Sequence, residues 1–401
     1  MLRRLTVTES DVVAARINWL CTVRGGVDEG LLVKAVDVVV DGMAPLRARL
    51  GRDEHGLFLH QPEVEAPGLI LGTGSVEDEL EIPVGPEGPL VRVALLPGAE
   101  EDIIAVGVSH SIADGRSVLA IMKEIWRVYT ALVEGTEVPI IEADIPESAL
   151  AGLAHWTADE VAAHVERRRA EVVRVPHVPF EPAIGDRPEV TRMLIDRDTT
   201  ARIAAGARAG GTSMHGLIAA ALLLAARAEI GTCDELGFVS SVDMRPRLVP
   251  PLPEDAITPC SGWFFDRVDV HGGDPLMIAR GINERLSLAV SSGVADLDLL
   301  AYEQLRVDPG FRDQTTVSMN NLGRIPAPRL PRGLRMTDLR TFVSVASRFR
   351  PDVDRDPLPA SVLTFDGRLE ISIPHRPDCF GQVQVARILD HVRTTLTGCA
   401  A

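Results

Sequence analysis

The chain has 401 residues, and 46% of them are hydrophobic, which indicates about two globular domains. A formal net charge of −16 argues against generic nucleic-acid binding, because phosphate contacts need a basic face. The five cysteines are scattered without a Cys-x-x-Cys pair, which favours a reducing compartment. The N-terminus lacks the apolar core of a signal peptide, and the longest apolar stretch, residues 217–226, is about half of a bilayer span. We therefore expect a cytoplasmic protein without a membrane span.

The first part of the chain alternates predicted strands with predicted helices, bounded by Gly- and Pro-rich turns. The predicted elements are a strand at 5–7, a helix at 10–19 that Ser10 could cap, a helix at 31–40, strands at 46–50, 57–60 and 90–96, and a buried central strand at 103–109.

A histidine stands at the end of that central strand. His110 is followed by Asp114 and Gly115, which open a predicted amphipathic helix. An imidazole is neutral for much of the time near pH 7, so His110 can act as a general base if its orientation is held. Simpler interpretations remain open: Asp114 as the helix N-cap, Gly115 as a residue of positive φ, and His110 as a satisfied core histidine.

Prolines interrupt regular structure between residues 138 and 188. Within this connector, Thr157 and Glu160 form a capping box that opens a helix to about residue 172. We predict an N-terminal half at 1–175, a linker at 176–190 and a C-terminal half at 191–401.

The second half repeats the alternation. Its Ala- and Leu-rich helix at 217–229 is apolar on nearly all sides and should be buried. The other predicted elements are helices after Asp198, at 276–290 and at 378–396, and strands at 193–196, 236–242, 263–270, 315–318, 341–347, 360–365 and 369–373.

Other chemistries lack the residues that they need. The acidic run Asp352, Asp354 and Asp356 lacks the Gly and Glu of a calcium loop, since Pro357 and Leu363 occupy those positions. The sequence also has no phosphate-binding loop and no Gly-x-Ser-x-Gly nucleophile elbow. We expect neither a metal nor a tightly bound cofactor.

Three short motifs together resemble a known superfamily. They are SHSIADG at 109–115, VDMRPRL at 242–248 and SMNNLGRI at 318–325. The first resembles the His-His-x-x-x-Asp-Gly motif of condensation-domain and chloramphenicol-acetyltransferase-like acyltransferases, with Ser109 in place of the first histidine. The other two are similar to segments of polyketide-associated, phthiocerol/phthiodiolone dimycocerosyl transferase-like members. The resemblance implies an α/β (α+β) fold of two chloramphenicol-acetyltransferase-like halves, each a mixed sheet flanked by helices, with an active-site tunnel between them.

The resemblance also implies roles for individual residues. His110 would be the base, and Asp114 would be structural, paired with an arginine: Arg245, or otherwise Arg247. Ser109 and Gly115 would support the site. The candidates for the oxyanion donors or tunnel lining are Ser318, Asn320 and Asn321, and a turn-forming role explains the two asparagines equally well.

The implied function is acyl transfer from a thioester, on coenzyme A or a carrier protein, to a hydroxyl of a natural-product or lipid acceptor. Acyl-coenzyme A or acyl-phosphopantetheine would be a co-substrate, and an acyl carrier protein is a candidate partner. Three alternatives stay open at this point: amide formation, a non-catalytic member that binds a carrier protein or small molecule, and recruitment to a non-acyl reaction. Ser109 is the residue that keeps the last two open.

Overall fold

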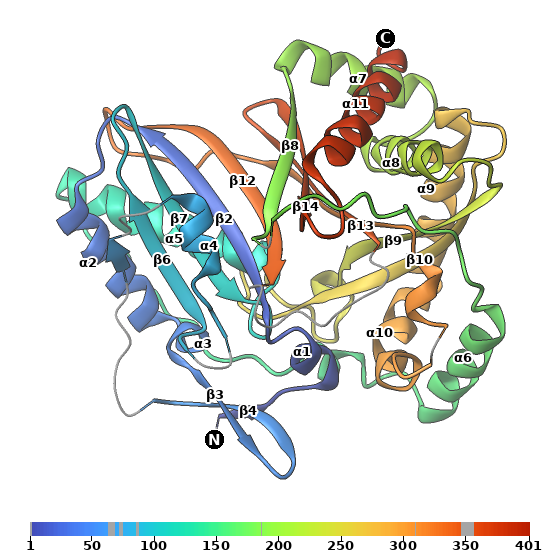
Figure 1. The fold of residues 1–401 in the computed structure, drawn as a ribbon. Helices are drawn as coiled ribbons and strands as arrows, with labels where there is room; N and C mark the ends of the chain where they lie inside the picture. Colours follow the sequence, from blue (N-terminus) through green and yellow to red (C-terminus); the bar gives the residue numbers. More distant parts are fainter. Residues whose placement is uncertain are drawn as a thin grey trace. The chain divides into compact units, whose positions relative to one another are not determined.

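The computed structural model describes residues 2–62, 69–71, 75–85, 88–185, 187–308, 310–345 and 357–401 (Figure 1). The chain forms two compact units, and neither is continuous in the sequence. Unit 1 comprises Met1–Gly152, Pro250–Cys260 and Pro326–Arg350, and unit 2 comprises Leu153–Val249, Ser261–Ile325 and Pro351–Ala401.

Unit 1 is built on a mixed five-stranded sheet in the order β12-β2-β7-β6-β5. Its strands are antiparallel except for the parallel pair β5 and β6. Helices α2 and α5 pack against each other, and both contact this sheet (Figure 1). The elements are β1 (Arg3–Arg4), α1 (Val7–Asp11), β2 (Ala15–Arg24), α2 (Glu29–Gly42), α3 (Ala44–Arg47), β3 (Arg49–Asp53), β4 (Gly56–His60), β5 (Leu69–Leu71), α4 (Val76–Glu81), β6 (Val91–Leu96), β7 (Glu101–Ser109), α5 (Gly115–Glu134), the 3-10 turn η1 (Ala151–Leu153) and β12 (Arg335–Val345).

Strand β2 occupies most of the segment for which a helix at 10–19 was expected, so that prediction was wrong. Helix α1 ends at Asp11, and every residue of β2 except Arg24 is buried. Helix α5 contacts β2, and Arg16 of β2 donates to the carbonyl oxygen of Glu79 in α4. A strand that is covered on both faces loses the alternation of polar and apolar residues that identifies strands in a sequence.

Unit 2 is built on a mixed six-stranded sheet in the order β10-β9-β11-β13-β14-β8. Strand β11 is parallel to both of its neighbours, and the other pairs are antiparallel. The elements are α6 (Ala158–Glu171), β8 (Glu189–Ile195), α7 (Arg197–Ala209), α8 (Met214–Ile230), β9 (Glu235–Asp243), η2 (Arg245–Arg247), β10 (Ser261–Asp269), α9 (Pro275–Ser291), α10 (Val294–Leu305), η3 (Arg312–Gln314), β11 (Val317–Ile325), β13 (Leu358–Phe365), β14 (Arg368–His375) and α11 (Gln382–Gly398).

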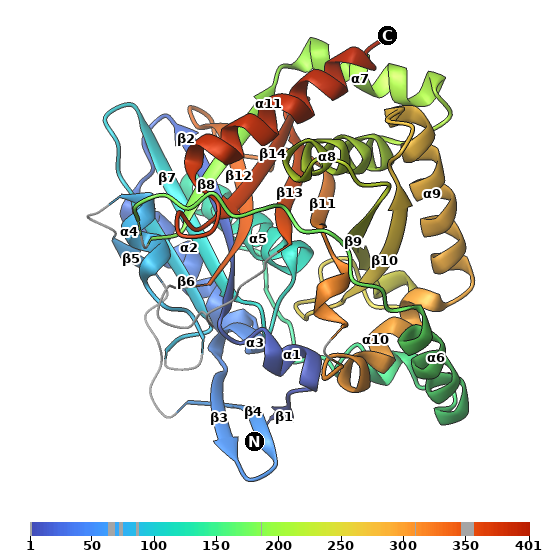
Figure 2. The ribbon, with the colours of Figure 1, turned by 45° about the vertical axis from the view of Figure 1, so that its right-hand side comes forward.

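Helix α8 forms the centre of the core of unit 2. Its N-cap Ser213 accepts a hydrogen bond from the N–H of Gly216 at 3.1 Å, and every residue from Gly216 to Ala226 is buried. The helix contacts α9 and α11 as well as strands β9 and β11, as Figure 2 shows. The prediction that the helix at 217–229 is buried is confirmed.

Two segments that we expected in the C-terminal half belong to unit 1 instead. Strand β12 pairs antiparallel with β2 along its length, from Arg335 opposite Arg24 to Val345 opposite Ala15. The segment Pro250–Cys260 is attached to the start of α5 through hydrogen bonds described below. The predicted halves, 1–175 and 191–401 with a linker at 176–190, are continuous in the sequence, and the observed units therefore differ from them. Long-range pairing of this kind leaves no local pattern in a sequence.

Within the part of the chain that the structure describes, no single helix is long and apolar enough to cross a membrane. Helices α7 and α8 meet the length and composition test only as a pair bent by 98°, and α8 is the buried core helix.

Candidate active site

The turn that carries His110 is anchored to the strands on both sides of β7. The N–H of His110 donates to the carbonyl oxygen of Ala15 at the start of β2, at 2.9 Å. The N–H of Ser109 donates to the carbonyl oxygen of Leu90, just before β6, at 2.8 Å. Because β7 is a central strand, the backbone that presents the imidazole is held on both sides.

A glycine in β7 makes room for a buried charged cluster. A Cβ atom on Gly107 would lie 2.0 Å from Nε of Arg16, so a larger residue there would displace the Arg16 guanidinium. Arg16 donates to the carbonyl oxygens of Glu79 and Ile82 at 2.9 and 3.0 Å, and the Glu79 carboxylate accepts from Arg92 at 2.8 Å. These bonds attach α4 to the sheet next to the strand that ends at His110.

The imidazole of His110 is only partly exposed. Burial lowers its pKa, while the backbone of His110 and Ala113 and the negative charge of Asp114 act in the opposite direction. Its Nδ1 atom is buried and, among the described residues, meets no hydrogen-bond partner. The ring is therefore neutral at pH 7, which is the state that a general base needs.

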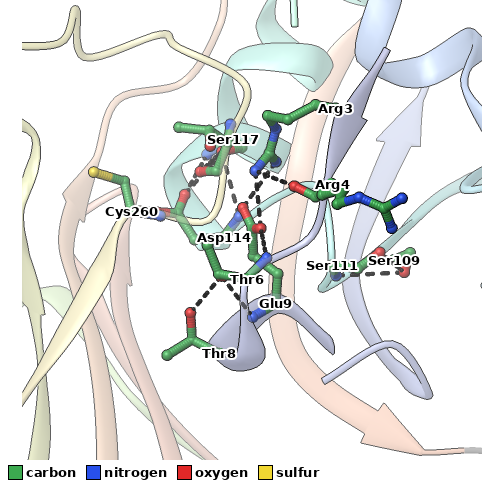
Figure 3. A network of polar contacts seen from close by, with 11 residues as sticks. Arg3, Arg4, Thr6, Thr8, Glu9, Ser109, Ser111, Asp114, Ser117 and Cys260 are labelled. Carbon is green, nitrogen blue, oxygen red and sulfur yellow. Dashed lines mark hydrogen bonds and ion pairs between the residues drawn. The ribbon is translucent and has the colours of Figure 1, made fainter. Parts of the chain in front are cut away.

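Asp114 caps α5 and holds a distant part of the chain. Its Oδ1 atom accepts from the N–H and the hydroxyl of Ser117, both at 2.9 Å, and its Oδ2 atom accepts from the N–H of Cys260 at 3.1 Å (Figure 3). The N-cap interpretation of Asp114 is confirmed. Gly115 is the first residue of α5 and is not among the glycines with positive φ, so that interpretation was wrong.

Ser109, at the position of the first motif histidine, is fully buried. Its hydroxyl lies 2.8 Å from the hydroxyl of Ser111, and Oγ of Ser109 also accepts from the N–H of Ser111 at 3.4 Å (Figure 3). Both side chains close the turn around His110 and lie away from solvent.

The three oxyanion candidates lie on β11 of unit 2, and they do not share a face. Successive side chains of a strand point to opposite sides, so Ser318 and Asn320 lie on one face and Asn321 lies on the other, with the buried Met319. Oδ1 of Asn321 accepts from the N–H of Gly323 at 2.9 Å, which agrees with the turn-forming interpretation. Ser318 and Asn320 therefore remain the two oxyanion candidates that lie on the same face of β11.

Both arginine candidates are engaged within unit 2. Arg245 is buried in η2, and its Nη1 atom lies 3.2 Å from Oδ1 of Asp243. Arg247 forms a bidentate ion pair with Asp296 of α10: its Nε donates to Oδ1, and its Nη2 donates to Oδ2 at 2.9 Å. The pairing of Asp114 with Arg245 stays a prediction.

His215 is a polar residue of this unit that the sequence did not single out. Burial lowers its pKa to about 4. The Gly323 N–H fixes the amide of Asn321, so Nδ2 of Asn321 faces Nδ1 of His215 at 3.4 Å. Nε2 then carries the proton and faces Oγ of Ser240 at 3.5 Å. The sequence does contain one indication of this residue: His215 is a histidine in the first turn of an otherwise apolar helix.

Within the described ranges, no group of three or more His, Cys, Asp or Glu residues could hold a metal ion. His164, in α6, faces Oδ1 of Asp298 in α10 through Nε2 at 2.8 Å, as a buried structural pair. The acidic run Asp352, Asp354 and Asp356 lies outside the described residues.

The fold consists of two mixed sheets flanked by helices, and the His110 turn joins a central strand to a long helix. Solved structures share this fold. Polyketide synthase associated protein 5 from Mycobacterium tuberculosis superposes with a TM-score of 0.79 at 21% identity, covering 98% of this chain and 97% of that one. The first condensation domain of the calcium-dependent antibiotic synthetase superposes with a TM-score of 0.77 at 18% identity, covering 100% and 98%.

The sequence comparisons agree with the fold. Residues 185–374 match the family model of the phthiocerol/phthiodiolone dimycocerosyl transferase C-terminus. The phthiocerol/phthiodiolone dimycocerosyl transferase of Mycobacterium leprae (strain TN) is 24% identical over 274 residues, which span 63% of this chain and 64% of that protein. The chain is therefore similar in sequence to this transferase family and in fold to these solved structures, so the expected resemblance and the expected mixed α/β fold are confirmed.

Proposed function

We propose that the protein transfers an acyl group from a thioester donor to a hydroxyl of a natural-product or lipid acceptor, with His110 as the general base. The observation that carries the proposal is the position of His110, on a turn whose backbone is bound to both neighbouring strands. Burial lowers the pKa of its imidazole, which favours the neutral form. The match to a transferase family supports the same class of reaction.

The chemistry follows from the state of that ring. His110 takes the proton of the acceptor hydroxyl as the oxygen attacks the thioester carbonyl. The carbon–sulfur bond then breaks, and the leaving thiolate takes the proton from the imidazolium. An acyl-enzyme is not needed, because the thioester is already activated. Ser318 and Asn320, on one face of β11, are our candidates for the donors to the oxyanion.

The donor would be acyl-coenzyme A or an acyl-phosphopantetheine on a carrier protein, which would then be a partner. The free cysteines favour a cytoplasmic setting, where such thioesters occur. Ser109 is compatible with the proposal, because its hydroxyl is fully buried and lies within hydrogen-bonding distance of the Ser111 hydroxyl inside the turn.

The test is thiol release from acyl-coenzyme A donors of increasing chain length, with alcohol and amine acceptors and the product masses read from the same reactions. Replacing His110 with Ala should lower the rate at least ~10²-fold. The matched control is His55→Ala, which removes an exposed histidine of the β3–β4 hairpin and should leave the rate unchanged.

Each outcome has a separate meaning. An ester product that depends on His110 supports the proposal, whereas an amide product alone would assign the amide-forming alternative. A product that forms without release of free thiol would indicate a non-acyl reaction. No turnover with either coenzyme A or carrier-bound donors would contradict the proposal and favour a binding protein.

A further inference from the structure

A proline-rich segment of unit 1, which we call the strap (Pro250–Cys260), interrupts the sequence of unit 2. It forms no helix or strand, yet Ile257, Thr258 and Cys260 are buried. Buried backbone N–H and carbonyl groups need hydrogen-bond partners. The partners of the strap therefore show what holds it in place.

The strap is held through backbone groups on both sides of one proline. The N–H of Thr258 donates to Oγ of Ser117 at 3.2 Å, and the N–H of Cys260 donates to Oδ2 of Asp114 at 3.1 Å. Pro259, which stands between them, has no N–H to satisfy. Two backbone donors two residues apart thus meet the first turn of α5, and they bind to side chains there.

The hydroxyl of Ser117 lies at the centre of this attachment and is fully buried. Its oxygen is 2.9 Å from Oδ1 of Asp114, 3.0 Å from the carbonyl oxygen of Thr258 and 3.3 Å from that of Ala256. Besides donating to one of these acceptors, it accepts from the N–H of Thr258. Among small side chains, only a hydroxyl group, such as that of Ser or Thr, donates and accepts strongly at the same atom.

We propose that Ser117 is a positioning residue, whose hydroxyl fastens the strap to α5 and thereby fixes the Asp114 carboxylate beside His110. Ser117 holds Oδ1 of that carboxylate, and Cys260 of the strap holds Oδ2. The negative charge that counteracts the burial of His110 is therefore held by residues far apart in the sequence. The kinetic consequence rests on the proposed function, whereas the attachment of the strap does not.

Hydrogen exchange of the purified full chain tests the attachment without any substrate. Ser117→Ala should accelerate exchange of the backbone amides at 256–262 on the order of tenfold, because it removes the acceptor of the Thr258 N–H. The matched control is Ser372→Ala in β14, which removes a buried hydroxyl that donates to a Glu370 carboxylate oxygen at 2.8 Å. It should leave the strap protected. Equal strap protection in the two variants and the wild type would overturn the proposal.

A size-matched variant separates hydrogen bonding from packing. Ser117→Cys fills nearly the same space, but a thiol is a weak donor and acceptor, so this variant should resemble Ser117→Ala. Wild-type protection of the strap in Ser117→Cys would show that packing holds the strap, which contradicts the proposal.

The kinetic readout separates a positioning role from general destabilisation. Because Ser117 is buried, Ser117→Ala should lower kcat on the order of tenfold while KM stays within about twofold, and Ser372→Ala should change neither. A rise in KM with unchanged kcat would contradict a role in positioning the base. If the wild type transfers no acyl group at all, the proposed function fails, and the exchange experiment still decides the attachment.

Discussion

The histidines His110 in unit 1 and His215 in unit 2 are both partly buried, and their surroundings differ. Burial lowers the pKa of each ring. At His110 the carboxylate of Asp114 counteracts that effect, whereas at His215 the pKa falls to about 4, and its neighbours at hydrogen-bonding distance are Ser240 and Asn321. A base is most effective when its pKa lies near the working pH. The carboxylate next to it and its anchored turn favour His110 as the base, whereas the low pKa of His215 makes that residue a neutral hydrogen-bonding group.

The largest effect should separate the two histidines in activity. Replacing His110 with Gln should lower kcat/KM at least ~10²-fold, because the glutamine amide cannot take a proton. Replacing His215 with Gln should cost less than roughly tenfold, since an amide can replace its weak hydrogen bonds. Initial rates of thiol release under identical conditions measure both. A larger loss in the His215 variant would reverse the assignment.

The next effect concerns stability in acid. The pKa of His215 is about 4 in the folded protein and near 6.5 when the chain is unfolded, so its stabilising contribution is complete above pH 6.5 and is lost as the pH falls toward 4. Up to about 3 kcal/mol of unfolding free energy is involved. Denaturant unfolding between pH 7 and 4 should show a smaller loss in His215→Gln than in the wild type. Parallel curves would contradict the assignment.

A smaller effect should appear in the pH profile. The rate should rise with pH through the pKa of His110 and level off, and the midpoint should lie below 6.5 because burial lowers that pKa. Asp114→Asn keeps an N-cap residue but removes the negative charge that raises the pKa of His110, so it should move the midpoint further down. A midpoint that rises in this variant would show that the charge does not act on the ring.

The smallest effect belongs to Ser109. Ser109→Ala removes the hydrogen bond with Ser111 and should lower the unfolding free energy by about 1 kcal/mol. Since Ser109 is fully buried, kcat/KM should stay within a few-fold of the wild type. A loss as large as that of His110→Gln would mean that Ser109 has a direct part in the reaction.

The sequence by itself determined the features that depend on neighbours in the chain. The N-cap of α5 at Asp114, the capping box at Thr157 and the burial of α8 all follow from residues within a few positions of one another, and the structure confirms each of them. The motif around His110 was also readable, because strand, turn and helix follow each other without interruption. These features depend on residues close together in the chain, so they can be recognised in the sequence.

Only the tertiary structure decided the features that depend on distant contacts. Strand β2 was mistaken for a helix because covering both of its faces removed the polar–apolar alternation. Three further features could be found only once it was known which parts of the chain meet. They are the attachment of the strap to Ser117, the separation of Asn321 from Ser318 and the low pKa of His215. A hydrogen bond or a desolvated ring depends on what surrounds it in space, and those neighbours come from far along the chain.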